Sequence, residues 1–127
     1  MSERGIRELV YGFCQALTLK NLDEISELFS DDASLSWGPY DFVGKESILT
    51  WVTEFFKLFP FIAIKEKQLQ VFDSTAKHEF MIGFLTAQGR KGGLPCEGIY
   101  TIKDGKIHQI NVKVLYGFLS VSRDEVG

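Results

Sequence analysis

The chain has 127 residues, of which 45% are hydrophobic and 24% are charged. This composition excludes a disordered chain and supplies one hydrophobic core, so we expect a single domain over residues 1–127. The net charge is −3 and the Lys and Arg residues are scattered, which argues against a nucleic-acid partner. The N-terminus shows no signal-peptide pattern, and no apolar run approaches the ~20 residues of a membrane span. We therefore expect a cytoplasmic protein with no membrane partner.

The cysteines and histidines give no pattern of a metal or redox site. Cys14 and Cys96 lie in apolar surroundings without Cys-x-x-Cys spacing, which favours two buried free thiols in a reducing cytoplasm over a disulfide. The two histidines stand thirty residues apart with no paired carboxylate, a poor ligand set for a metal ion. We expect no metal and no cofactor.

Three helices are predicted in the N-terminal half. Apolar residues at steps of three and four predict a helix over residues 3–19. Asn21, with Glu24 three residues later, predicts the start of a short second helix, and its expected buried side includes Phe29. A third helix follows Gly44 and ends before Pro60, because the residue before proline disfavours the α conformation.

Five strands are predicted, one before the third helix and four after it. Alternation from Ala33 to Trp37 predicts the first strand, which ends at Gly38-Pro39, and the residues up to Val43 are predicted to form a loop. The later strands are expected at about 62–72, 78–88, 94–103 and 106–118. Asp104-Gly105 between two alternating runs predicts a two-residue hairpin with positive φ at both positions.

The strand at 78–88 is apolar on both faces. Phe80, Ile82 and Phe84 share one face, while Met81 and Leu85 occupy the other. A strand of this kind is usually covered on both sides. Because all three helices are expected on one face, we expect a second subunit on the other, and hence a homodimer through the outer face of the sheet.

Three segments carry a resemblance to a known family. Residues 21–33 (NLDEISELFSDDA) resemble a helix-to-strand passage of the NTF2-like superfamily, 42–48 (FVGKESI) resemble the start of its long helix, and 103–107 (KDGKI) resemble its last hairpin. The chain is most similar to the SnoaL-like and ketosteroid isomerase-like group. The resemblance implies an α+β fold, a cone-shaped barrel of three N-terminal helices packed on a curved, mostly antiparallel sheet, with a pocket between the layers.

The reactive residues of the isomerases in that group are not found at the matching positions of this chain. The pattern needs a carboxylate base at the end of the first strand, where this chain has Trp37, and a tyrosine where it has Phe13. The position of the pattern's second acidic residue falls near Gly98 of this chain. All three reactive groups are replaced, so steroid-type isomerisation is disfavoured, and the fold alone assigns no function.

Three other residues are candidates for catalysis. Tyr100, on the expected inner face, could donate a hydrogen bond to a ligand oxygen, or could be a core tyrosine. His78, on the same parity as Phe80, could move a proton, although a histidine at a strand end is more often solvated. Asp41 could act as a base if its loop reached over the pocket, but a solvated carboxylate is the usual state of such a residue.

Further residues are expected to face the pocket or to lie outside it. His108 shares the inward parity, whereas Glu97 is expected on the outer face. The expected lining is mostly aromatic: Phe13, Trp37, Trp51, Phe55, Tyr116 and Val112.

These observations leave three functions open. The first is a binder of a small apolar or cyclic molecule, which an aromatic pocket without an acid–base pair would suit. The second is a SnoaL-like lyase, isomerase or hydrolase that uses Tyr100 with His78 or Asp41. The third is a dimeric interaction module without a cavity.

Overall fold

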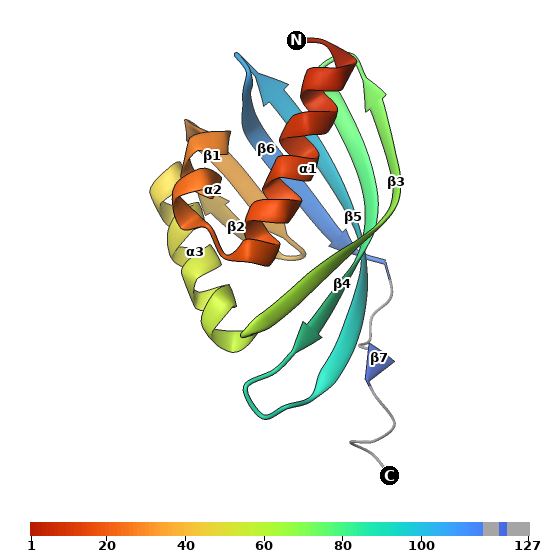
Figure 1. Ribbon diagram of the computed structural model, residues 1–127. Coiled ribbons are helices and arrows are strands. Elements are labelled where there is room, and N and C mark those ends of the chain that lie inside the picture. The colour runs from red at the N-terminus through yellow and green to blue at the C-terminus, as the bar shows by residue number, and fades with distance from the viewer. Residues whose placement is uncertain (116–119, 122–127) are drawn as a thin grey trace.

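The computed structural model describes residues 1–115 and 120–121, and Figure 1 shows its helices gathered on one face of a curved sheet. The elements are α1 (Glu3–Leu19), α2 (Leu22–Leu28), β1 (Phe29–Trp37), β2 (Tyr40–Val43), α3 (Lys45–Leu58), β3 (Phe61–Phe72), β4 (Thr75–Leu85), β5 (Lys91–Lys103), β6 (Lys106–Val114) and β7 (Ser120–Val121). None of the described helices has the length and apolar character needed to cross a lipid bilayer.

The sheet combines an antiparallel meander with one parallel pairing. Its strand order is β2-β1-β6-β5-β4-β3, and β7 pairs with β5. The pairing of β1 with β6 is parallel, and every other pairing of the described strands is antiparallel. In this order β2 and β3 are the two edges, so the sheet is curved but not closed. The α+β architecture with three helices on one face is the predicted one.

Local signals of the sequence set the ends of the helices. The Ser2 hydroxyl accepts a hydrogen bond from the backbone N–H of Gly5 at the start of α1. The Asn21 side chain accepts one from the backbone N–H of Glu24 over 3.1 Å, which confirms the predicted cap of α2. At the last hairpin, Asp104 and Gly105 have φ of 53° and 75°, as predicted for that turn.

The predicted boundaries are wrong in several places. Residues 40–43, predicted as part of a loop, form β2, because the turn at Gly38 and Pro39 folds them back onto β1. Phe29, assigned to the second helix, begins β1, where its ring packs on Phe13 at 5.5 Å between centroids. The strand predicted at 78–88 runs from Thr75 to Leu85 instead, because a turn closes from Thr86 onward. The strand predicted to reach residue 118 is described only to Val114.

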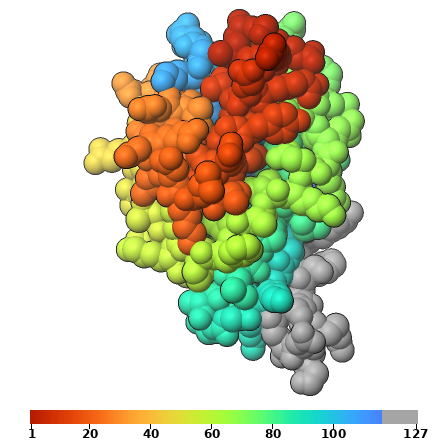
Figure 2. Space-filling view, in the orientation of Figure 1, coloured from red at the N-terminus to blue at the C-terminus, as the bar shows by residue number. Residues whose placement is uncertain are grey.

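The core lies between the helices and the concave face of the sheet. Figure 2 shows α1, in red to orange, lying across the face of the molecule that the helices cover. Its buried stripe includes Ile6, Val10 and Phe13. On the sheet side Ile82, Tyr100 and Val112 are all buried, so the predicted inward parity of the long strands is confirmed.

Candidate functional site

The main cavity lies between α3 and the inner face of β4 and β5. Its volume is about 320 Å³. The third helix contributes residues one turn apart, which the helical repeat places on one face. The cavity is lined by Trp37, Tyr40, Trp51, Glu54, Phe55, Leu58, Phe59, Ile82, Phe84 and Leu94.

Aromatic rings form one continuous wall of this cavity. The centroid of Trp51 lies 5.6 Å from that of Trp37 and 5.4 Å from that of Phe55. Phe59 continues the row, at 5.0 Å from Phe55 and 4.9 Å from Phe84. Offset and tilted ring contacts at these distances are favourable, so the wall is ordered by its own packing.

A narrow second cavity of about 30 Å³ lies deeper, toward α1. It shares Trp37 and Trp51 with the main cavity and adds Phe13, Tyr100 and Val112 to the lining. Its volume is close to that of a single water molecule, so it is too small for an organic ligand.

Tyr100 and Cys14 meet at this narrow end. The tyrosine is only 2% exposed. Burial is the main reason that the pKa of Tyr100 lies well above its usual value, and the Cys14 thiol contributes to the shift. Burial, followed by the charge of Glu66, raises the pKa of Cys14 to about 12. Both groups are therefore neutral near pH 7.

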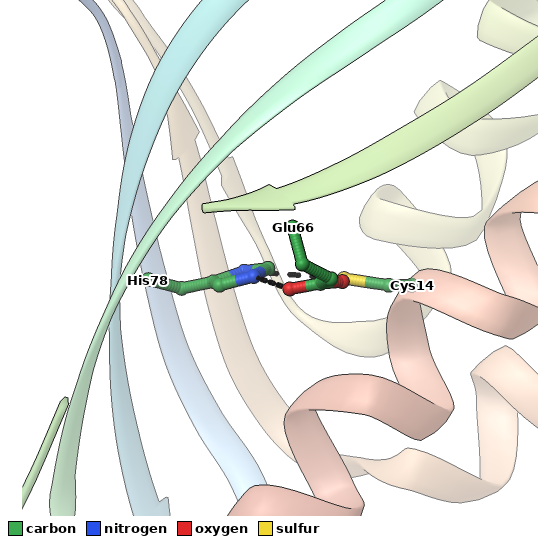
Figure 3. Close-up of side chains that lie close together, drawn as sticks. All are labelled: Cys14, Glu66 and His78. Atoms are coloured by element: carbon green, nitrogen blue, oxygen red, sulfur yellow. Dashed lines mark hydrogen bonds and ion pairs between the residues drawn. The ribbon is translucent and has the colours of Figure 1, made fainter. Parts of the chain in front are cut away.

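His78 lies on the inner face of β4 and is fully buried. Its Nε2 contacts the carboxylate of Glu66 on β3, and its Nδ1 lies 4.0 Å from the Cys14 sulfur on α1. Figure 3 shows the three side chains converging from these three elements. The Phe80 ring stacks on the imidazole at 4.8 Å. The cluster of Cys14, Glu66 and His78 thus lies between α1 and the sheet, and His78 does not line the main or the narrow cavity.

Glu66 reaches this cluster from the position just before a β-bulge in β3. In the pairing of β3 with β4, Glu66 lies opposite Phe80 and Gln68 lies opposite Glu79, so Lys67 is the extra residue. The bulge reverses the parity of the residues that follow it, so Leu69 faces inward as well. Glu66 was not among the predicted site residues, although it shares the parity of the inward residues Ile62 and Ile64.

The remaining predicted residues lie away from the main cavity. Asp41 is on the exposed β1–β2 hairpin, where its carboxylate accepts a hydrogen bond from Ser36. Glu97 lies on the outer face, as expected, with its carboxylate 3.6 Å from the Lys77 ammonium. His108 was expected to face inward, but a bulge in the pairing of β5 with β6 places its Nδ1 3.3 Å from the Ser30 hydroxyl.

The predicted lining residues divide between the two cavities. Trp37, Trp51 and Phe55 line both, whereas Phe13 and Val112 line only the narrow one. Tyr116 lies outside the described residues. The two cysteines are free and buried, as predicted.

Solved structures share this fold at low sequence identity. SalBIII, an epoxide hydrolase/cyclase-like enzyme of pyran ring formation in the polyether salinomycin, matches with a TM-score of 0.85 and 14% identity, over 95% of this chain and 98% of that one. An LEH-like epoxide hydrolase of M. tuberculosis matches with a TM-score of 0.77 and 14% identity, over 86% and 81%.

A third structure, from Catenulispora acidiphila, is a protein with a ketosteroid isomerase-like fold in complex with trimethylamine. It matches with a TM-score of 0.76 and 15% identity, over 84% of each chain. At these identities the likeness establishes the fold alone. Among curated proteins none matches this chain.

The sequence itself matches one family, described as the SnoaL-like domain, over residues 10–110. This match covers most of the chain and confirms the resemblance drawn from its three motifs. The chain belongs to the SnoaL-like family, within the NTF2-like superfamily.

Proposed function

We propose that this protein binds a small, largely apolar, cyclic molecule in the main cavity and that it does so without catalysing a reaction. The observation that carries the proposal is a cavity of about 320 Å³ with an aromatic wall and few polar groups in its lining. Ligand pockets span about 300–1,000 Å³. The volume therefore suits a molecule of one or two rings.

The lining also indicates how such a molecule would be held. The rings of Trp37, Trp51 and Phe55 offer faces for stacking, and burial of apolar ligand area supplies about 25 cal/mol per Å². Tyr40 and Glu54 are the exposed polar residues of the lining. A hydroxyl or carbonyl group of the ligand would lie toward these two residues rather than toward the narrow end.

The enzymatic alternative uses Tyr100 with His78 or Asp41. Neither His78 nor Asp41 lines the main or the narrow cavity, and Tyr100 lines only the narrow one. General acid–base catalysis needs such groups within about 3 Å of the reacting atoms. The epoxide hydrolase and cyclase-like neighbours keep this alternative open, because they act through the same fold. The third alternative, a module without a cavity, is disfavoured by the cavity volume.

Tryptophan fluorescence gives a direct test. The chain contains two tryptophans, and both line the main cavity. A panel of monocyclic terpenoid ketones, phenols and naphthols should include compounds that change this emission saturably at a stoichiometry of one. Native mass spectrometry of protein purified from its own host would then identify the natural ligand.

The same titrations separate binding from catalysis. Recovered compounds should be unchanged after long incubation with the protein. Conversion of any bound compound, abolished by Tyr100→Phe, would overturn the noncatalytic proposal in favour of the enzyme. A panel without a single saturable change in emission would count against the cavity as a ligand site.

Two further properties are proposed with this function. We propose that two copies pair through the outer face of β4, where Met81 and Leu85 are only half buried and Phe61 on β3 is 60% exposed.

We also propose a cytoplasmic location, which the two free thiols support because such thiols persist in a reducing compartment. Fractionation of the host cells would test the location, and recovery of the protein outside the cytoplasm would contradict it.

A further inference from the structure

Three side chains with metal-binding atoms meet between α1 and the sheet. The Cys14 sulfur, a Glu66 oxygen and a His78 nitrogen all lie within 4.8 Å of one another. They come from α1, β3 and β4, elements that are far apart in the sequence (Figure 3). In a tetrahedral zinc site the bond lengths place such atoms roughly 3.3–3.8 Å apart. In this structure Glu66 contacts Nε2 of His78 while the Cys14 sulfur lies 4.0 Å from Nδ1, so one ion would be enclosed only after the Cys14 or the Glu66 side chain rotates toward the other nitrogen.

The charges of the cluster suit a cation better than they suit a nucleophile. Burial is the larger reason that a thiolate is disfavoured at Cys14, and the neighbouring Glu66 carboxylate disfavours it further. The other rings beside His78 belong to Tyr11, Phe80 and Tyr100, which bring no positive charge. A bound divalent cation would compensate both negative groups, and a thiol that coordinates such an ion is deprotonated outright.

A groove of about 330 Å³ between α1 and β3 leads to the cluster from outside. Cys14 and Glu66 line its floor, together with Tyr11, Gln15 and Thr18 of α1. The Glu66 side chain is 42% exposed, so an ion can reach it without unfolding of the core. With three protein ligands, the fourth position would face this groove and be open to water or to a small ligand.

We propose that Cys14, Glu66 and His78 form a binding site for a divalent ion of the zinc type, with one coordination position open to the groove between α1 and β3. Sulfur, imidazole nitrogen and carboxylate oxygen are the donors that zinc uses in proteins. His78 contributes one ring nitrogen, and the Cys14 proton is released to solvent when the ion binds. The site is separate from the main cavity, so the test of the metal site is independent of the test of the proposed function.

Two other arrangements would use the same residues without a metal. In the first, a neutral His78 donates to Glu66 and accepts from the Cys14 thiol, which satisfies a buried histidine and nothing more. In the second, His78 activates Cys14 as a nucleophile and Glu66 orients the imidazole. Titration with Zn²⁺ and Co²⁺ distinguishes the metal site from both.

The test uses the full chain, free of any affinity tag, kept reduced, and titrated with Zn²⁺ by calorimetry and with Co²⁺ by absorption. One equivalent should bind, with a thiolate-to-cobalt charge-transfer band in the near ultraviolet, and Zn²⁺ should raise the melting temperature. Cys14→Ser should abolish the band, and Glu66→Gln should weaken binding at least about tenfold. Cys96→Ser is the matched control, because Cys96 is also a buried free thiol but lies outside the cluster.

The outcomes decide the proposal in either direction. The band and the affinity should survive in Cys96→Ser and in His108→Gln, a control for the second histidine. Circular dichroism of each variant without metal establishes that it is folded, and Glu66→Gln, whose side chain is half exposed, is the variant least able to disturb the core. Absence of saturable zinc binding by the parent, or a cobalt band that survives Cys14→Ser, would overturn the site. Rapid alkylation of Cys14 that Zn²⁺ fails to slow would overturn it in favour of the nucleophile.

Discussion

Trp37 and Trp51 join the end of β1 to α3 across the wall of the main cavity, with their ring centroids 5.6 Å apart and their planes at 42°. Neither ring is fully buried. Because both tryptophans of the chain stand at one cavity, any molecule that enters it changes the surroundings of every indole in the protein.

Leu94→Lys should reduce binding at this cavity by at least about tenfold. Leu94 lines the cavity from β5 and is half buried, so a lysine there would place a charged group against an apolar ligand, at a cost of more than about 1.4 kcal/mol. The measurement is the dissociation constant of the tightest compound in the panel, from tryptophan fluorescence. Val43→Lys is the control, because Val43 is 75% exposed and does not line the cavity. Equal affinities of the two variants would place the ligand elsewhere.

Cys96 should make stability depend on pH above 9. Burial raises the pKa of its thiol from 9.0 to about 12, so the folded state favours the protonated thiol. Below pH 9 the thiol is protonated in both the folded and the unfolded state, so its contribution to the free energy of unfolding is fully present. It is lost as the pH rises from 9 toward 12, because only the unfolded chain releases the proton.

Cys96→Ala should therefore flatten the pH profile. Between pH 8 and pH 10 the variant should lose at most roughly 1 kcal/mol less of its unfolding free energy than the parent chain. Urea unfolding at the two pH values, under reducing conditions, gives the comparison. The slope with pH is the relevant quantity, because the substitution also changes packing at every pH. Parallel profiles would mean that the Cys96 thiol titrates in the fold as it does in water.

Two glycine substitutions should change stability in opposite directions. Gly105 has φ of +75° in the last hairpin, and Gly105→Ala should cost about 1 kcal/mol because an L side chain is strained there. Gly12 lies inside α1, and an added Cβ would meet nothing within 4 Å. Gly12→Ala should stabilise the protein by about 0.5–1 kcal/mol. Thermal unfolding of both variants checks the signs. A destabilising Gly12→Ala would show that this helix face packs against something the structure does not describe.

Regular strands were predictable from the sequence because their side chains alternate without interruption. The alternation of β5 and β6 placed Tyr100 and Val112 on the inner face, where the structure has them. His108 was misplaced because it lies at a bulge, and Glu66, which directly precedes one, was missed. One extra residue reverses the parity on its far side, and no local residue preference marks it reliably.

For Glu66 a signal was nevertheless present. The inward residues of β3 change from Ile62 and Ile64 to Leu69 and Val71, so their parity switches between 64 and 69. An odd interval of this kind requires a bulge, and it leaves Glu66 on the inner side. The meeting of Glu66 with Cys14 could not be predicted, because it depends on where α1 crosses the sheet, which neither periodicity nor capping determines.

Leu85→Asp should convert a dimer into monomers. The apolar part of the outer face lies at one end of β3 and β4, where Leu85 is paired with the exposed Phe61. A buried aspartate in each copy would be too costly for an interface there. Sedimentation at tens of micromolar should show a dimer for the parent chain and a monomer for the variant. Thr101→Asp adds the same charge to the polar end of that face and should remain dimeric. A monomeric parent would remove the proposed dimer, and a dimeric Leu85→Asp variant would move its interface to another face.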